Sequence, residues 1–233
     1  VMLTNKNLVN FVDANEKNHE ILGYTERGRI SLAIAALTFD FAVMEEFVPI
    51  ANGMTVVLAT QEQILNPDLL TKLMTGNRVD VMSCTPGYLS NLTAIDSFLP
   101  AVKGLRSVDF GAEAFPPALY GKLKSINPGL YIMNGYGPTE ATVSCTMEVI
   151  DNAEDITSGI PNANVHVATV DRDGRLQPLG AMGELVIMGD GVGRGYIGRE
   201  DLNKKSFFRL LGLPACRSGD LVRIREDGDI VVH

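Results

Sequence analysis

The segment LYIMNGYGPTE, residues 130–140, leads from a strand-like apolar run into a turn rich in functional side chains. Its two glycines permit a positive φ or the close approach of a ligand, and Pro138 restricts the backbone. Tyr136 offers a flat ring for stacking, and Glu140 offers a carboxylate of the kind that Mg²⁺ prefers. The segment therefore predicts a strand followed by a nucleotide- and metal-binding loop, with a plain surface turn as the alternative.

The flanking sequence predicts two lobes of different architecture. From Ser31 to about Ile150, apolar strand-like runs alternate with amphipathic stretches of helical length, a pattern typical of a parallel sheet with crossover helices. We therefore expect residues 1–150 to form a doubly wound, mostly parallel, flavodoxin-like α/β lobe. In residues 151–233 short alternating segments are separated by Gly and Asp-Gly turns, which predicts a β-rich, barrel-like lobe.

Functional groups are expected where the strands of the first lobe end. The expected strands cover residues 30–37, 55–59, 79–84, 106–110 and 131–133. The expected helices cover residues 43–51, 68–75, 87–94 and 117–124. Ligands of open α/β sheets bind beyond the carboxyl ends of the strands. One ligand is therefore expected to contact the segments that follow these strands, namely Asp40 and residues 84–86, 111–113 and 134–140.

Composition excludes several classes of function. The 233 residues are 45% hydrophobic and 21% charged, as in an ordered globular protein. A net charge of −8 without a basic tract argues against nucleic acid as a partner. Apolar runs are interrupted far short of the roughly 20 residues that span a bilayer, so no membrane segment is expected.

The termini and cysteines indicate the cellular setting. The chain starts at Val1 without a signal-peptide pattern, which predicts a processed or excised piece. Cys84, Cys145 and Cys216 match no metal-ligand spacing, and any one pair would leave an odd thiol. We therefore expect reduced thiols in a cytoplasmic protein. The three histidines are equally scattered and give little support to a histidine-based metal site or catalytic triad.

Four motifs in order resemble those of one enzyme family. They are FDFA at residues 39–42, NGYGPTEAT at residues 134–142, GELVIMGDGVGRGYIGRE at residues 183–200 and RSGDL at residues 217–221. Together they resemble the core motifs of adenylate-forming enzymes, most closely the amino-acid adenylation domains of nonribosomal peptide synthetases. VMLTNKN, residues 1–7, is similar to the segment that follows this family's phosphate loop, so the resemblance covers nearly the whole chain.

The resemblance implies ATP and Mg²⁺ as cofactors. It assigns Mg²⁺ binding to Glu140 and a hydrogen bond to the α-phosphate to Thr139, and these two are the expected catalytic residues. The expected adenine and ribose contacts are Gly111, Ala112, Glu113, Asn134, Tyr136 and Asp220. Ala112 stands where the family more often has glycine, which is expected to narrow the purine slot. Cys216 and Ser218 are further mild departures, and neither removes the ribose-binding carboxylate of Asp220.

The resemblance also implies an amino-acid substrate. Asp40 follows an expected strand, and from the residues alone it is equally consistent with a helix N-cap. In the family this aspartate holds the α-ammonium group of the substrate, which argues against a fatty acid. The other expected substrate-binding residues are Phe39, Phe41, Met44, Ser83, Asp109, Gly111, Gly135, Val143 and Ser144. Asp109 is expected either to meet a cationic or hydroxylated side chain or to face away.

Two remaining patterns receive structural interpretations. Gly189, Gly191, Gly193 and Gly195 do not match the G-x-G-x-x-G dinucleotide-binding spacing, so we expect them to form tight turns that let the lobes close. Lys204 and Lys205 are expected on a solvated face.

The implied reaction is attack of an amino-acid carboxylate on the α-phosphorus of ATP, which gives an aminoacyl adenylate and pyrophosphate. The acyl group would then pass to the phosphopantetheine thiol of a peptidyl carrier protein beside neighbouring synthetase domains. The family's phosphate loop and C-terminal lysine domain lie outside residues 1–233, so we expect these residues alone to be inactive. The alternatives are a D-alanine carrier-protein ligase, an acyl-CoA or aryl-CoA ligase, and an excised, non-catalytic specificity subdomain.

Overall fold

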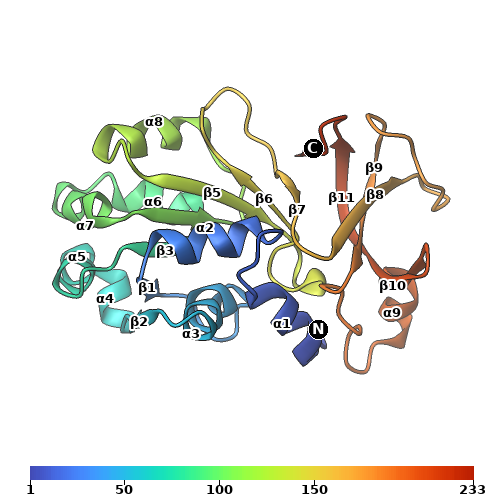
Figure 1. Ribbon diagram of the computed structural model, residues 1–233, viewed down its shortest axis with the longest axis horizontal. Coiled ribbons are helices and arrows are strands. Elements are labelled where there is room, and N and C mark those ends of the chain that lie inside the picture. Colours follow the sequence, from blue (N-terminus) through green and yellow to red (C-terminus); the bar gives the residue numbers. More distant parts are fainter.

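Two β-sheets lie next to each other in the computed structural model, which describes residues 1–233 (Figure 1). Sheet A has the strand order β2-β1-β3-β4-β5-β6-β7. Its parallel strands are β1 (Ile30–Ala33), β2 (Thr55–Leu58), β3 (Val81–Cys84), β4 (Ser107–Phe110) and β5 (Tyr131–Tyr136). The strands β6 (Thr146–Val149) and β7 (Ile160–Pro161) add an antiparallel edge.

Helices cover both faces of sheet A, which confirms the expected doubly wound architecture. One face carries the core formed with α5 (Pro67–Gly76), α6 (Pro86–Leu92), α7 (Leu99–Gly104) and α8 (Pro117–Ile126). The other face packs against α1 (Asn5–Val12), α2 (His19–Arg27), α3 (Val48–Ala51) and the π-helix η1 (Val43–Phe47). The short helices α4 (Gln61–Leu65), η2 (Asp96–Phe98) and η3 (Thr139–Ala141) complete this part of the chain.

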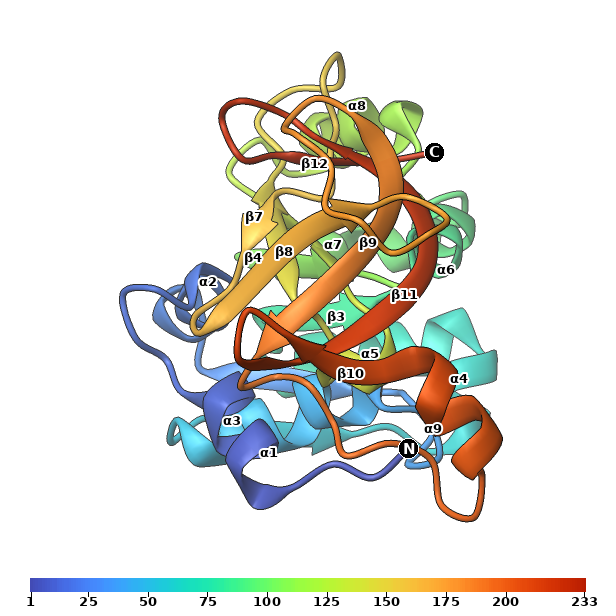
Figure 2. The same ribbon diagram turned by 90° about the vertical axis from the view of Figure 1, so that its right-hand side faces the viewer.

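Sheet B confirms the expected β-rich lobe. It is a five-stranded antiparallel sheet of β8 (Val165–Val170), β9 (Met182–Gly189), β10 (Phe207–Leu210), β11 (Leu213–Ile224) and β12 (Ile230–Val232). Figure 2 shows the long strands β9 and β11 curving across this sheet. The helix α9 (Glu200–Ser206) precedes β10 and carries the exposed Lys204 and Lys205, as expected. The chain passes from sheet A to sheet B between Pro161 and Val165.

Two elements of sheet A differ from the expected bounds for identifiable reasons. β1 ends at Ala33 rather than at residue 37, because the backbone N–H groups of Ile34 and Ala35 donate to Oε2 of Glu45, each at 2.6 Å. β5 continues past residue 133 to Tyr136, because it pairs with β6 as well as with β4. Hydrophobic periodicity within the strand reveals neither of these partners, because both lie outside the strand and become its neighbours only when the chain folds.

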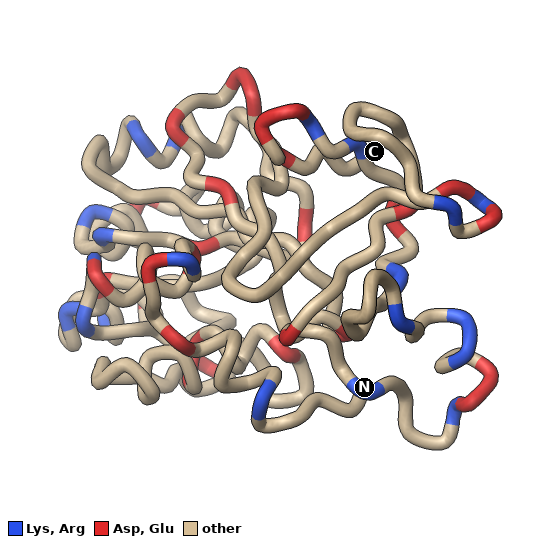
Figure 3. Tube along the Cα trace, turned by 45° about the vertical axis from the view of Figure 1, so that its right-hand side comes forward, with Lys and Arg blue, Asp and Glu red and all other residues tan.

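The charged residues are spread over the whole protein, and its helices are short. Figure 3 shows acidic and basic residues interspersed along the trace of both lobes. None of the helices combines the length and the apolar character required to cross a lipid bilayer.

Candidate nucleotide and substrate site

A cleft of about 530 Å³ opens between the two sheets, next to the end of β5. Its lining brings together five residues expected to contact a nucleotide: Ala112, Glu113, Asn134, Tyr136 and Asp220. Gly111 lines a second, smaller cavity next to the cleft. These residues come from the loop after β4, from the end of β5 and from β11, so only the folded chain assembles them. Their contacts with a nucleotide stay a prediction.

A hydrogen bond between the lobes defines one wall of the cleft. The Tyr136 hydroxyl donates to Oδ2 of Asp220, 84 residues further along the chain. Burial and the nearby carboxylate of Asp220 raise the pKa of Tyr136, so its hydroxyl stays protonated and remains a donor. The ring of Tyr136 and the carboxylate of Asp220 therefore lie together, as stacking on a base and binding to its ribose would require.

The β11 backbone is distorted where Asp220 lies. Its pairing with β9 shifts register between Arg217 and Leu221, and Gly219 has a φ of +84°. The backbone N–H of Asp220 donates to Oγ of Ser218 at 3.0 Å. Such a bulge changes the direction in which a strand presents its side chains. The RSGDL motif thus places the carboxylate of Asp220 in the cleft rather than in a regular ladder.

Asn134 and Glu113 are each held by a backbone group near the cleft. The Asn134 side-chain amide donates to the carbonyl of Thr157 at 2.9 Å, and its Oδ1 makes no hydrogen bond. That oxygen is available to accept from the amino group of a base. Oε2 of Glu113 accepts from the backbone N–H of Gly87 at 3.0 Å, which ties the loop after β4 to the start of α6.

The backbone of the turn after β5 lies unusually close to the segment before β6. A Cβ at Gly137 would lie 2.6 Å from both Cα of Ser144 and the backbone nitrogen of Cys145. The N–H of Cys145 also donates to the carbonyl of Tyr136 at 2.8 Å. Gly137 is therefore needed for this packing, whatever else the turn does.

The short helix η3 carries Thr139 and Glu140 and ends in a strained segment. Thr142 and Val143 both have positive φ, +64° and +67°, which costs a β-branched residue roughly 1–2 kcal/mol. The conformation is held by a hydrogen bond of 2.6 Å from the Thr142 hydroxyl to the carbonyl of Gly191. The N–H of Gly193 donates to the carbonyl of Glu140 at 2.8 Å, so the glycine-rich run packs directly on η3.

Glu140 suits a magnesium ion that also binds phosphate. Its Oε1 accepts from the Tyr196 hydroxyl at 2.6 Å, and its Oε2 makes no hydrogen bond. No cluster of three metal-ligating side chains exists in the protein. Mg²⁺ commonly takes only one or two protein carboxylates and completes its shell with phosphates and water. Glu140 lines neither cavity, but its neighbours Pro138 and Thr139 do, and its single free carboxylate oxygen fits that pattern.

The second cavity, of about 150 Å³, lies on the other side of the turn after β5. It shares four lining residues with the larger cleft: Ala112, Gly135, Gly137 and Pro138. Most of the expected substrate-binding residues line it, namely Phe39, Asp40, Phe41, Gly111, Gly135, Val143 and Ser144. The other three, Met44, Ser83 and Asp109, are fully buried and lie outside its lining.

Asp40 is half-exposed at the mouth of this cavity. The helix that follows receives no side-chain cap, and no hydrogen bond or ion pair engages the Asp40 carboxylate. The N-cap interpretation therefore has no support in the structure. Phe39 and Phe41 flank Asp40 and stack with their ring centroids 5.8 Å apart.

The sequence did not predict two buried carboxylates, one of which lines this cavity. Glu45 is 1% exposed and binds the loop after β1 through the N–H groups described above. Glu20 is 2% exposed and lines the cavity itself. Glu45 follows Asp40 closely and lies among apolar residues, which was a usable signal. Glu20 comes from a polar segment far from every motif, and its sequence context carries no such signal.

Comparison with known proteins agrees with this geometry. The model of the family of AMP-binding enzymes matches residues 1–197. Tyrocidine synthase 3 of Brevibacillus parabrevis is 33% identical over 235 residues, which cover 99% of this chain and 4% of that protein. Surfactin synthase subunit 3 of Bacillus subtilis is 36% identical over 208 residues, which cover 85% of this chain and 16% of that protein. The chain therefore spans only a small part of these relatives.

Solved structures show the same fold. The nonribosomal peptide synthetase FmoA3 is 28% identical, with a TM-score of 0.86 over 99% of this chain and 25% of its own. A four-domain nonribosomal peptide synthetase bound to AMP and glycine is 30% identical, with a TM-score of 0.83 over 97% of this chain and 17% of its own.

Proposed function

Because the chain belongs to the family of AMP-binding enzymes, we propose that it is the core of an amino-acid adenylation domain of a nonribosomal peptide synthetase. Residues 1–150 would bind the amino acid and the adenine, and residues 151–233 would contribute the ribose contact. The relatives and solved structures that resemble this chain are mostly synthetases of that type. This likeness supports the class of reaction. The two cavities support the assignment of amino-acid binding to the smaller one and of nucleotide binding to the larger one.

The observation that carries the proposal is the adjacency of the two cavities. They are separated by the backbone of Gly135, Gly137 and Pro138, which lines both. An amino acid bound through its ammonium group at Asp40 would present its carboxylate to this backbone. A nucleotide in the larger cleft would approach the same backbone from the other side. Binding both reactants next to each other is the main way in which such a site lowers the barrier.

The chain's own residues would hold the two reactants and help to offset the negative charge of the phosphates. Thr139 lines the small cavity and would donate its hydroxyl to the phosphate at which the carboxylate arrives. Glu140 would hold Mg²⁺, which supplies positive charge to the phosphates. Tyr136 would stack on the base, Asn134 would accept from its amino group, and Asp220 would accept from the ribose. Such preorganised groups stabilise charge as it develops during reaction.

The acyl group would be delivered to the phosphopantetheine thiol of a carrier protein. One structure with this fold contains an adenylation domain together with a peptidyl carrier domain, at 28% identity and a TM-score of 0.80. This supports a carrier protein and neighbouring synthetase domains as the partners.

The decisive experiment is amino-acid-dependent ATP–pyrophosphate exchange by the full-length protein, measured across a panel of amino acids. We expect exchange with one or a few L-amino acids and loss of exchange in Asp40→Asn. The control Asp173→Asn changes a carboxylate in an exposed turn and should leave exchange unchanged. Exchange only with D-alanine or with a carboxylic acid that lacks an amino group would contradict the proposal.

A further inference from the structure

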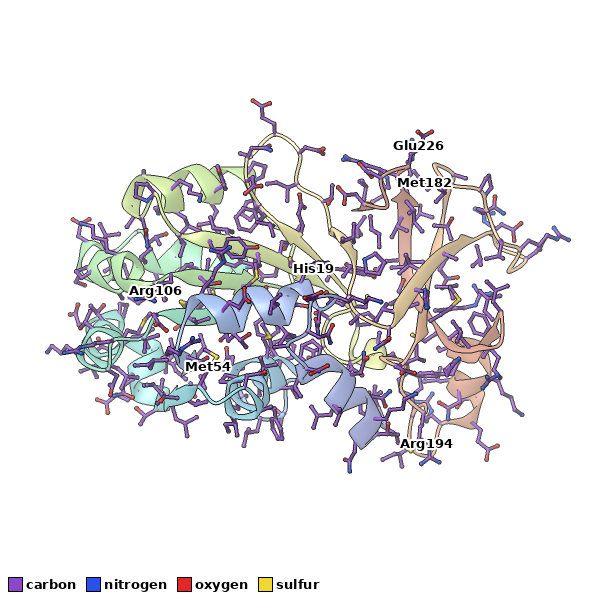
Figure 4. All side chains as sticks on the ribbon, in the orientation of Figure 1. His19, Met54, Arg106, Met182, Arg194 and Glu226 are labelled. Carbon is purple, nitrogen blue, oxygen red and sulfur yellow. The ribbon has the colours of Figure 1, made fainter.

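Glu20 extends a carboxylate into the small cavity from outside the family motifs. Figure 4 places His19, the first residue of α2, at the end of this helix nearest sheet B. Oε2 of Glu20 accepts hydrogen bonds from the Ser144 hydroxyl and from the amide of Asn162, the latter at 2.7 Å. Oε1 accepts none. The unpaired oxygen belongs to a side chain that is 2% exposed and lines the cavity.

Gly135 is the residue that gives Glu20 this access. A Cβ at Gly135 would lie 2.5 Å from Oε1 of Glu20, so another residue at position 135 would displace the end of this side chain. The cavity therefore contains a carboxylate oxygen where almost any other residue at position 135 would place carbon. The two residues are far apart in the sequence and are complementary only in the folded chain.

A second unpaired carboxylate, that of Asp109, is buried behind the lining of this cavity and close enough to Glu20 to be affected by its charge. Strand alternation directs Val108 and Phe110 of β4 into the core on the opposite face, so Asp109 faces the same side as Gly111, which lines the cavity. Asp109 is 1% exposed, and neither of its oxygens has a hydrogen-bond partner. Its register neighbour Ser83 also has a buried hydroxyl without a partner.

No cation compensates these groups. None of the five ion pairs of the protein includes Glu20 or Asp109. Burial raises the pKa of Glu20 to about 7, although its hydrogen bonds from Ser144 and Asn162 act against this shift. Burial also raises the pKa of Asp109 well above its usual range, and the charge of Glu20 raises it further. Buried carboxylates in proteins are normally paired with a cation or fully hydrogen-bonded.

We propose that Glu20 and Asp109 form a cation-selective end of the side-chain pocket, and that the substrate is an α-amino acid with an ammonium or guanidinium side chain. This inference rests on the proposed function. With the α-ammonium group at Asp40, the aliphatic stem of such a side chain would pack on Phe41 and Val143. Its terminal cation would reach Oε1 of Glu20, and its charge would also favour the ionised form of the buried carboxylate of Asp109 behind the cavity lining. A cation supplies both the missing hydrogen-bond donors and the missing positive charge.

Neutral side chains fit this pocket less well. A leucine or phenylalanine side chain would bring carbon against carboxylate oxygens that have lost their water. An amide or hydroxyl would donate to one oxygen but would bring no positive charge to stabilise the ionised form of these buried carboxylates. Removing one partner of a buried ion pair is strongly destabilising, so the pocket should discriminate against neutral analogues of similar length by about 100-fold or more.

The test compares pairs of amino acids that differ in charge and little in shape. ATP–pyrophosphate exchange by the full-length protein is measured with lysine against norleucine and with arginine against citrulline. In the pair that contains the preferred cation, we expect kcat/KM for the charged amino acid to exceed that for its neutral partner by about 100-fold. Lysine and arginine form separate arms, which identify an ammonium or a guanidinium as the preferred cation.

Two variants connect this preference to the carboxylates. In Glu20→Gln, the amide oxygen can still accept from Ser144 and Asn162, so the fold is retained while the charge is lost. Glu20→Gln and Asp109→Asn should each lower kcat/KM for the cationic substrate and raise it for the neutral partner. The control is Asp80→Asn, because the Asp80 carboxylate is likewise an acceptor within the fold, from two backbone N–H groups at 2.9 and 2.8 Å, but lies at the opposite ends of the strands.

The outcomes separate this inference from the proposed function. Exchange with neutral amino acids alone, unchanged in both variants, overturns the cation-selective pocket and leaves an adenylation domain. Absence of exchange with every amino acid overturns both. A selectivity change equal to that of Asp80→Asn would show that the carboxylates act on the fold rather than on the substrate. Urea unfolding of each variant verifies that the compared proteins are folded.

Discussion

The Tyr136 hydroxyl donates a hydrogen bond to the Asp220 carboxylate and joins the last residue of β5 in sheet A to the bulge of β11 in sheet B. Both residues line the larger cleft, and they come from different sheets and different sequence motifs. Their contact joins the two lobes at the cleft in which a nucleotide is expected to lie. The shape of this cleft therefore depends on how the two lobes pack.

Removing the carboxylate at this contact should weaken nucleotide binding more than removing the hydroxyl. Asp220→Asn loses a charged acceptor for the ribose, and a hydrogen bond to a charged group contributes about 1.5–3 kcal/mol. We expect a roughly 10- to 100-fold weaker Kd for ATP by isothermal titration calorimetry. Tyr136→Phe keeps the stacking ring and should cost less than about tenfold. Equal effects of the two changes would contradict the assigned roles.

Glu140 should determine how much Mg²⁺ the reaction requires. Its Oε1 already accepts from Tyr196, so the free Oε2 is the oxygen expected to contact the ion. Glu140→Gln should raise the Mg²⁺ concentration for half-maximal pyrophosphate exchange at least about tenfold, because a neutral amide binds Mg²⁺ poorly. Tyr196→Phe leaves the carboxylate in place and serves as the matched control. A Glu140→Gln protein with an unchanged Mg²⁺ requirement would exclude Glu140 as the metal-binding residue.

Ala112 should be a point of backbone strain. It has a φ of +66°, a conformation that glycine adopts without a Cβ penalty. Ala112→Gly should therefore raise the free energy of unfolding by up to about 1 kcal/mol, since relief of strain exceeds the added flexibility of the unfolded chain. The measurement is urea unfolding. The control Ala118→Gly lies at an exposed position of α8 and should instead lower stability by about 1 kcal/mol.

Glu45 should make stability depend on pH. Burial raises the pKa of Glu45 from 4.5 to about 7. The folded chain therefore retains a proton that the unfolded chain loses, so Glu45 lowers stability progressively between those two values and fully above them. Glu45→Gln should abolish this contribution and reduce the loss of unfolding free energy between about pH 5.5 and about pH 8 by roughly 2 kcal/mol.

Urea unfolding of wild type and Glu45→Gln at both pH values provides the measurement. Taking the difference between the two proteins cancels the titration of groups that they share. Glu46 is the nearby carboxylate whose charge adds to the pKa shift of Glu45, so Glu46→Gln is the natural control and should have a smaller effect. An identical pH dependence for Glu45→Gln and wild type would show that Glu45 carries no proton in the folded state at neutral pH.

The succession of elements in the first lobe was predictable from sequence because hydrophobic periodicity reports which face of each element is buried. The apolar runs that became β2, β3 and β4 and the amphipathic stretches that became α5, α6 and α8 kept nearly their expected bounds. The function of the NGYGPTE segment could also be predicted, because its combination of glycines, an aromatic ring and a carboxylate is more typical of a binding loop than of a plain turn. Tyr136 and Glu140 could therefore be proposed before the fold was known, whereas Asp40 was proposed only through the resemblance to a known family.

Contacts between distant segments were not predictable in the same way. Whether Tyr136 meets Asp220, whether Oε1 of Glu20 reaches past Gly135, and whether Asp109 lies unpaired behind the lining of the cavity all depend on how α2 and sheet B pack on sheet A. Local sequence determined the kinds of side chain and the direction each faces on its own element. Only tertiary packing decided which side chains line the same buried cavity. That cavity determines the charge and the shape that a ligand must have.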